Sequence, residues 1–359
     1  MTQPDGLGSA EKHEWVGMVG FPDRGEKTPM SEIARRAFVT LLGGAVLWPS
    51  AVLAQKSDGV RRVGIVMGFA ENDEVWQAFL VTFRQALQDL GWTSGRNIRF
   101  DYRFTGESEE RMRLMAEEIV GTAPDVILAS TNSVVSAMLK VTRTIPIVFT
   151  WVSDPVRSGF VANLPHPGGK ITGFHNFEPA IAGKWLAYLS QIAPGLRRVA
   201  VVHVPDIAPN VAFLRVIEAA APQMGIAVSS AEIRNAADIE RALSDFGQHG
   251  GGLIVTPSAL TATRRDLIID LAARFKLPAI YSFGFYSESG GLISYGINQL
   301  EQARPAASYV DQILRGTNPG DLPVQLPLKY ELVINLKTAA SLGLTVPNSL
   351  QLLADHVIE

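Results

Sequence analysis

Three short apolar segments in the first half of the chain have counterparts in the second half, in the same order. The pairs are 61–67 with 197–203, 125–130 with 252–258, and 145–150 with 277–282. Each segment is continuously apolar rather than alternating, which is typical of parallel strands buried on both faces of a sheet. This repeat constrains the fold strongly, because two copies of one unit predict two similar lobes with a cleft between them.

The segments between these strands have the spacing of helices that cover the faces of a sheet. After Asn72 and Asp73, whose side chains suit a helix N-cap, apolar residues recur at helical spacing until Gly91. A counterpart follows Pro209. Each half therefore reads β-α-β-α-β-α-β with right-handed crossovers. The predicted fold class is α/β, with two doubly wound parallel-sheet lobes joined by crossover strands.

Length and composition agree with a two-lobed globular protein. A chain of 359 residues is about two domains at roughly 150 residues each. The hydrophobic fraction of 47% and charged fraction of 19% are ordinary for a globular protein with a core. The formal net charge of -3 offers no basic surface of the kind that coats nucleic acid, so we expect no nucleic-acid partner.

The N-terminal part predicts a cleavable export signal at 30–54. Arg35-Arg36 precede an apolar run at 38–47, and the small-residue ending Val52-Leu53-Ala54 predicts cleavage before Gln55. The arginine pair resembles the twin-arginine signal in its RR-x-F core. The apolar run contains glycines and is shorter than the ~20 residues of a membrane span, which disfavours an anchor. We therefore expect export to the periplasm.

Residues 1–29 are polar, contain Pro, Gly and mixed charge, and have no apolar period. Met30 stands just before a signal of normal length. We interpret 1–29 as a non-native or disordered extension and Met30 as the true start. The chain has no cysteine, so it has neither disulfides nor a lipid-modified cysteine at the cleavage site.

Motifs for catalysis, cofactors and metals are missing from the sequence. It contains no G-x-S-x-G, H-E-x-x-H or G-x-G-x-x-G motif. The six histidines have no metal-ligand spacing; they are His13, His166, His175, His203, His249 and His356. We therefore assign no catalytic residue, no metal and no cofactor.

Polar and aromatic residues do follow the predicted strands, at the end of parallel sheets where ligands bind. The candidate ligand-binding residues are Phe69, Asn72, Ser130, Thr131, Asn132, Ser153, Asp154, Asp206, Pro257, Ser258, Tyr281, Phe283 and Tyr295. Hydroxyls and amides suit a carboxylate, aromatic walls suit an apolar group, and Asp154 or Asp206 suits an ammonium. This set favours an amino-acid-like solute.

Several of these residues have an equally simple structural explanation. Asp154 before Pro155 is a common N-cap and first-turn pair, and 131–133 can cap the helix that begins near Val134. The aromatic residues can close the edges of the two cores. Both interpretations stay open for these positions.

Four stretches, taken together and in order, give a family resemblance. They are 144–149 running into Ser153-Asp154-Pro155-Val156, then 167–173, 290–296 and 331–339. Residues 61–359 resemble the type 1 periplasmic solute-binding proteins of ABC transporters, in the branch similar to tryptophan-type binding proteins. In that family the loops that match 130–132 and 153–154 contact the ligand.

The resemblance implies two lobes that close on a solute and deliver it to an inner-membrane ABC transporter permease. The implied lobes are 60–174 plus 297–318 and 175–296 plus 319–359. Crossings are expected near 172–176, 294–297 and 321–326, and we expect a monomer.

Two alternatives remain. A periplasmic sensor that presents its ligand to a membrane receptor has the same sequence features, and a cleft hydrolase or isomerase assembled from distant residues leaves no motif. A repressor is disfavoured, because 1–59 holds a signal instead of a helix-turn-helix.

Overall fold

The computed structural model describes residues 59–106 and 108–359. The predicted signal at 30–54 and the extension at 1–29 lie outside these residues. Within the described part, the secondary structure alternates strands and helices along both halves of the chain.

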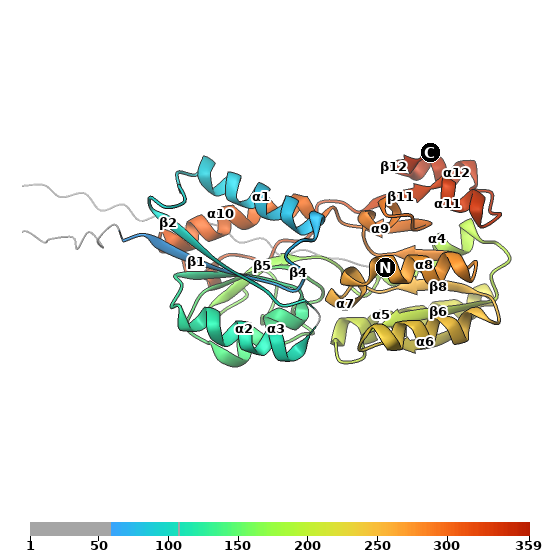
Figure 1. Ribbon diagram of the computed structural model, residues 1–359, viewed down its shortest axis with the longest axis horizontal. Coiled ribbons are helices and arrows are strands. Elements are labelled where there is room, and N and C mark those ends of the chain that lie inside the picture. Colours follow the sequence, from blue (N-terminus) through green and yellow to red (C-terminus); the bar gives the residue numbers. More distant parts are fainter. Residues whose placement is uncertain (1–58, 107) are drawn as a thin grey trace, which may run out of the picture. The chain divides into compact units, whose positions relative to one another are not determined.

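The first sheet has five parallel strands in the order β2-β1-β3-β4-β5 (Figure 1). The strands are β1 (Arg61–Met67), β2 (Ile98–Phe104), β3 (Val126–Ser130), β4 (Ile147–Val152) and β5 (Ile171–His175). Strands β3 and β4 are buried along their whole length, as continuous apolar strands require. The carboxyl ends of all five strands therefore lie at one edge of the sheet.

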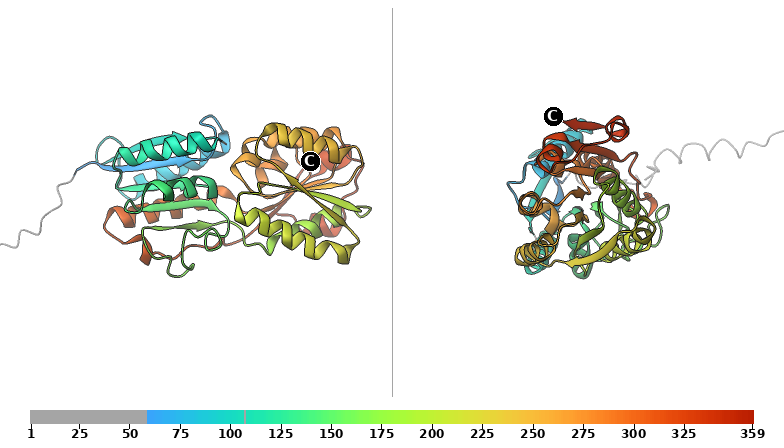
Figure 2. Two further views of the ribbon diagram at one scale, coloured as in Figure 1. Left: turned by 90° about the horizontal axis from the view of Figure 1, so that it is seen from below. Right: turned by 90° about the vertical axis from the view of Figure 1, so that its right-hand side faces the viewer.

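The second sheet repeats this order and adds two strands. Its order is β12-β11-β10-β9-β8-β6-β7, so that β7-β6-β8-β9-β10 corresponds to β2-β1-β3-β4-β5. The strands are β6 (Arg198–His203), β7 (Ala227–Glu232), β8 (Gly252–Val255), β9 (Ala279–Tyr281), β10 (Ile293–Gly296), β11 (Glu331–Asn335) and β12 (His356–Ile358). Only β10 and β11 pair antiparallel. Strand β12 forms the outer edge, where the C-terminus lies (Figure 2). The fold class predicted from the repeat is confirmed.

Helices cover the faces of both sheets. They are α1 (Glu74–Asp89), α2 (Glu109–Gly121), α3 (Asn132–Val141), α4 (Ile181–Ile192), α5 (Ala208–Ala220), α6 (Ala236–Gly247), α7 (Ala259–Thr263), α8 (Arg265–Arg274), α9 (Gly284–Glu288), α10 (Ala303–Leu314), α11 (Leu336–Ser341) and α12 (Asn348–Leu353), with 3-10 turns η2 (Ala221–Met224), η3 (Gln299–Gln302) and η4 (Pro319–Asp321). In the first lobe α1 and α10 lie on one face of the sheet and α2 and α3 on the other (Figure 1). In the second lobe α4 packs against α5, and α6 against α8.

Each face of the first sheet buries its own apolar cluster. Val63 and Ile65 pack into the cluster that includes Phe79 of α1, whereas Val66 packs into the cluster that includes Met138 of α3. Of the two N-cap candidates, Asp73 caps helix α1 and Asn72 does not, because the Asp73 carboxylate accepts the Val75 N–H (3.2 Å). Both faces of the sheet are thus sealed, and its free edge is the carboxyl end of the strands.

Three segments cross between the lobes. They are the end of β5 with the residues that follow it, the residues after β10, and the residues between η4 and β11. The first and third are hydrogen-bonded to each other. The N–H of Gln325 donates to the carbonyl oxygen of Gly173 (2.9 Å), and the N–H of His175 donates to that of Gln325 (2.9 Å). An isolated parallel bridge joins Phe174 and Gln325. Relative motion of the lobes must therefore bend a pair of bonded segments.

Two glycines let the crossing strands lie directly against their neighbours. A Cβ atom on Gly173, whose φ is +156°, would lie 2.1 Å from the carbonyl oxygen of Phe149. One on Gly296 would lie 1.8 Å from the carbonyl oxygen of Ser282. Neither distance leaves room for a methyl group, so glycine is required where backbone meets backbone.

Gly296→Ala should therefore destabilise the protein by about 1–3 kcal/mol or more, because the methyl group overpacks against a backbone that cannot move aside. Urea unfolding would show a lower midpoint. The control is Gly183→Ala in α4, where the nearest atom to an added Cβ is 4.0 Å away. This substitution should raise the stability slightly, by less than about 1 kcal/mol. Equal losses at both glycines would contradict the steric argument.

Candidate functional site

A cavity lies between the carboxyl ends of the two sets of strands, with both sheets contributing to its wall. Its lining residues are Phe69, Trp76, Thr131, Asn132, Ser133, Trp151, Ser153, Ile207, Pro257, Ser258, Ala259, Ala262 and Phe283. The cavity volume is about 20 Å³, which is room for about one water molecule. The two lobes are therefore closed on each other in this structure.

Aromatic rings form the first-lobe wall of the cavity. Trp76 stacks on Phe69, with ring centroids 3.6 Å apart and planes at 14°. The ring centroid of Trp151 lies 3.7 Å from that of Trp76 and 4.4 Å from that of Phe79. Trp76 also reaches the second lobe, where the ring of Phe285 lies 6.2 Å away at 73°. Rings in such contact contribute about 0.5–1.5 kcal/mol per pair beyond burial, so they form a firm apolar surface.

A β-bulge turns Trp151 toward this surface. The pairing of β4 with β5 shifts between Phe149 and Val152, and Trp151 has a φ of +55°. Its backbone N–H donates to Oε1 of Gln302 (3.1 Å), which holds the unusual conformation. The indole Nε1 is buried without a hydrogen-bond partner in the protein. Trp151 thus contributes to the cavity wall an aromatic ring and an indole N–H that has no hydrogen-bond partner in the protein.

The polar loops of the first lobe are locked to each other. The Asn132 amide accepts the N–H of Ser153 (2.9 Å) and donates to the Ser153 carbonyl oxygen (2.7 Å) and to Ser158 (2.9 Å). Its hydrogen-bonding capacity is nearly used up, so Asn132 positions the loops rather than reaching for a ligand. Thr131, by contrast, has a φ of +72° and a buried Oγ1 with no partner. That hydroxyl is free to bind a solute.

The second-lobe wall is built by a helix cap. Ser258 accepts the N–H of Thr261 (3.0 Å), and the Thr261 hydroxyl closes the capping box by accepting the N–H of Ser258 (3.1 Å). The carbonyl oxygen of Pro257 accepts from the amide of buried Asn210 (3.0 Å). These bonds fix the loop that faces the aromatic wall.

One ion pair spans the lobes beside the cavity. Nη1 of Arg265, the first residue of α8, lies 2.5 Å from Oδ2 of Asp73, and the two side chains are 18% and 9% exposed. The Arg265 guanidinium also lies over the ring of Phe285 (5.6 Å). Because water is largely excluded, this pair is worth more than an exposed surface pair.

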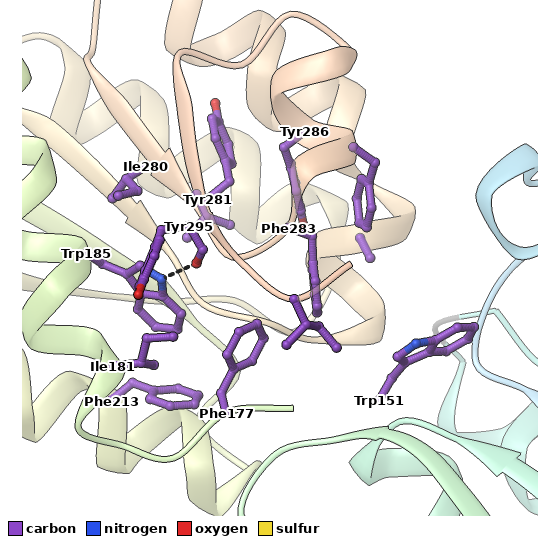
Figure 3. Close-up of a cluster of buried hydrophobic side chains, with 14 of the residues drawn as sticks. Trp151, Phe177, Ile181, Trp185, Phe213, Ile280, Tyr281, Phe283, Tyr286 and Tyr295 are labelled. Carbon is purple, nitrogen blue, oxygen red and sulfur yellow. Dashed lines mark hydrogen bonds between the residues drawn. The ribbon is translucent and has the colours of Figure 1, made fainter. Parts of the chain in front are cut away.

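The structure brings seven of the predicted site residues to the cavity wall. These are Phe69, Thr131, Asn132, Ser153, Pro257, Ser258 and Phe283. In Figure 3, Phe283 is drawn between Trp151 and the body of the second-lobe cluster, whereas Tyr295 and Trp185 lie on its far side. The seven come from loops that follow β1, β3, β4, β8 and β9.

The six others lie elsewhere for identifiable reasons. Ser130 is buried and accepts the Gly68 N–H (3.0 Å), while Tyr281 is buried against Tyr286. Burial raises the pKa of the Tyr281 phenol far above its ordinary value. Tyr295 accepts the Trp185 indole N–H on its carbonyl (2.7 Å), away from the cavity.

Asn72 is exposed beside the N-cap that Asp73 provides. The carboxylate of Asp154 accepts the Arg157 N–H (3.1 Å) and pairs with its guanidinium (2.9 Å). Asp206 is 65% exposed and pairs with Arg234. The structure therefore does not bring these two carboxylates, which were expected to hold an ammonium group, to the cavity wall.

Sequence reasoning missed Trp76, Ser133, Trp151, Ile207, Ala259 and Ala262. Trp76 has the spacing of a core residue of α1, and only the contact with Phe285 reveals its second role. Trp151 lies between the predicted strand at 145–150 and the candidate residue Ser153. The bulge that turns its side chain toward the cavity has no sequence signature. Ser133 directly follows the candidate Asn132, but it was not among the residues predicted to line the cleft.

The described residues give no indication of a metal site or a membrane span. No group of three or more His, Cys, Asp or Glu side chains among residues 59–106 and 108–359 is placed to hold a metal ion. In the same part of the chain, no helix is long and apolar enough to cross a membrane.

The His203 ring is hydrogen-bonded to the Ser230 hydroxyl (2.8 Å), and burial lowers the pKa of the His203 imidazole.

Comparisons with known proteins agree with this geometry. Residues 66–358 match the family model described as ABC transporter substrate binding protein. A tyrosine-binding protein of Clostridioides difficile is 25% identical over 262 residues, which are 73% of this chain and 75% of that protein.

Two solved structures share the fold. A conserved domain protein of Vibrio cholerae has a TM-score of 0.77 and 27% identity, covering 83% of this chain and 99% of its own. A Streptococcus pneumoniae ABC domain in complex with L-Trp has a TM-score of 0.77 and 19% identity, with the same coverage of 83% and 99%.

Asp73→Asn should open the cleft. Asparagine keeps the N-cap of α1 but removes the charge, so closure should lose about 1.5–3 kcal/mol, the usual contribution of a hydrogen bond to a charged group. Small-angle X-ray scattering would show a larger radius of gyration. Asp89→Asn is the control, because its pair with Arg304 is 52% and 65% exposed and lies outside the cleft. An equal radius of gyration in both variants and the parent protein would exclude a role in closure for the pair of Asp73 and Arg265.

Proposed function

Because its match to the family model spans residues 66–358, the chain belongs to the ABC transporter substrate-binding proteins, and we propose that it captures an aromatic amino-acid-like solute or aromatic acid for delivery to an ABC transporter. Proteins of this family bind substrates and are not enzymes. The observation that carries the choice of solute is the ring wall of Phe69, Trp76 and Trp151 facing hydroxyl-bearing loops.

The polar groups around the rings suit a carboxylate. The Trp151 indole N–H and the Thr131 hydroxyl are buried without partners in the protein, and burying such groups unpaired costs about 1–3 kcal/mol each. A carboxylate between them would accept both hydrogen bonds and recover that cost. An aromatic side chain on the same solute would stack on the ring wall.

Capture requires the lobes to move. A cavity of about 20 Å³ is far smaller than the roughly 300 Å³ at which small-molecule pockets begin. The solute must enter an open cleft and be enclosed against the ring wall as the lobes return. Closure around the solute lowers the free energy of the closed state only by the contacts that this state adds.

The names of the relatives support the aromatic class. One is a tyrosine-binding protein and another was solved in complex with L-Trp. The proposal includes the wider setting: export by the signal at 30–54, a periplasmic monomer with lobes 60–174 plus 297–318 and 175–296 plus 319–359, and an inner-membrane permease as partner.

Calorimetric titration of the protein from residue 55 onward with L-tyrosine, L-tryptophan and benzoate should show saturable binding to at least one, with L-leucine and glucose inactive. Trp76→Ala should weaken that binding by at least about tenfold, equal to 1.4 kcal/mol, because the stacking surface is lost. Trp92→Phe is the matched control, since Trp92 bonds Asp311 (2.7 Å) away from the cavity.

Thr131→Val tests the carboxylate site separately. It keeps the shape of the side chain and removes the hydroxyl, so the affinity for an acid should fall about tenfold, while the affinity for the matching primary amide should fall less. Binding of glucose in preference to every aromatic acid, or full affinity in Trp76→Ala, would contradict the proposal.

A further inference from the structure

A second cavity lies at the three crossings between the lobes. Its volume is about 220 Å³, and its wall includes Phe174, His175, Ile297, Gln302, Tyr309 and Leu328. We call it the hinge pocket. The end of β5, the residues after β10, the 3-10 turn η3 and the residues after η4 each contribute to the wall, and α10 supplies the remainder. No residue that lines it also lines the cavity between the strand ends.

The wall of the hinge pocket is mostly apolar and aromatic. The rings of Phe174 and Tyr309 lie 5.0 Å apart at 48°. Leu326 and Leu328 are 51% and 98% exposed, although large apolar side chains usually avoid water. A cavity of about 150 Å³ lined by apolar side chains accepts benzene. The hinge pocket is therefore large enough for one aromatic ring with a small substituent.

One buried polar side chain in this wall has no partner. His175 is 2% exposed, and neither of its ring nitrogens makes a hydrogen bond in the protein. Burial lowers the pKa of the His175 imidazole below its ordinary value. Because both ring nitrogens are closed off from solvent, they do not face the open space of the hinge pocket, and the ring places no hydrogen-bonding demand on a ligand there.

The charge of the wall disfavours anions. Glu301 contributes a carboxylate, and no Lys or Arg lines the hinge pocket. The amide of Gln325 donates to the hydroxyl of Tyr309 (2.7 Å), which donates to the carbonyl oxygen of Pro323 (2.7 Å). These groups are already paired, so they add no demand for a charged ligand.

A single side chain connects the hinge pocket with the ring wall of the cleft. The amide nitrogen of Gln302 donates to Oδ1 of Asn176 (2.9 Å), and its Oε1 accepts the backbone N–H of Trp151 (3.1 Å). Gln302 lines the hinge pocket, and Trp151 lines the cleft cavity. A molecule in the hinge pocket therefore touches the group that holds Trp151 in its left-handed conformation.

We propose that the hinge pocket is a second binding site, for a small uncharged aromatic molecule, and that its occupation favours the closed lobes. The crossings must bend when the lobes open, which changes the shape of a cavity that they enclose. A ligand that fits the closed shape stabilises closure, and thermodynamic reciprocity requires that it also tightens solute binding in the cleft.

Indole is the probe. Calorimetric titration should show saturable binding that the double variant Leu326→Ala, Leu328→Ala weakens at least about fivefold, since fivefold is about 1 kcal/mol of lost contact. Both leucines are exposed, so folding is preserved. Ser308→Trp, on the pocket face of α10, should block the site outright. Leu352→Ala on α12 is the control, with a side chain 87% exposed and remote from the pocket.

Indole also resembles a cleft solute, so the cleft is blocked in parallel by Ser258→Trp. Indole affinity that survives this variant and falls in Ser308→Trp supports the hinge site. Loss of indole binding in Ser258→Trp, with no effect of the pocket variants, overturns it. Because indole can compete in the cleft, the affinity of the cleft solute is measured with and without indole both in the parent protein and in Ser308→Trp. The ratio of the two affinities should be at least about fivefold higher in the parent protein, which is a coupling of about 1 kcal/mol; equal ratios overturn the coupling. A missing cleft solute would contradict only the function proposed above.

Discussion

The contact of backbone with backbone at the crossings is the constraint on which both lobes depend. Gly173 and Gly296 lie so near the carbonyl oxygens of Phe149 and Ser282 that no side chain is possible. The same approach lets Gln325 bond to both sides of the first crossing. The chain thus passes between the lobes in tightly packed segments, and such segments confine the motion between the lobes to bending.

The cleft is stabilised by two kinds of interaction with different ranges. The contact of Trp76 with the second lobe acts only at close range, because a gap of about 0.5–1 Å already removes a quarter to a half of the dispersion energy. The pair of Asp73 and Arg265 acts over a longer distance, because charges in a partly dry environment still attract across several ångströms. Charge can thus align the lobes before the rings make contact.

The fold could be predicted from the sequence, and about half of the site could. Continuous apolar runs such as 126–130 and 147–152 have one physical explanation, burial on both faces, so the repeat led directly to the two sheets. The loop residues after a strand are different, since Ser130 and Thr131 are adjacent and chemically alike. Ser130 points inward to the Gly68 N–H, while Thr131 adopts a positive φ and faces the cavity. Only the backbone conformation separates them. Trp151 illustrates the same limit, because a bulge decides its direction.

The position of α10 has a consequence for how the chain folds. Strands β1 to β5 are complete at His175, yet the face of the first sheet that holds Val63 and Ile65 is covered by α1 together with α10, whose first residue is Ala303. The second sheet likewise needs β12 at the extreme C-terminus to complete its edge. Neither lobe can finish burying its apolar surface until most of the polypeptide has been synthesised. A chain with its closing elements at the far end therefore stays incompletely folded until its synthesis is nearly finished.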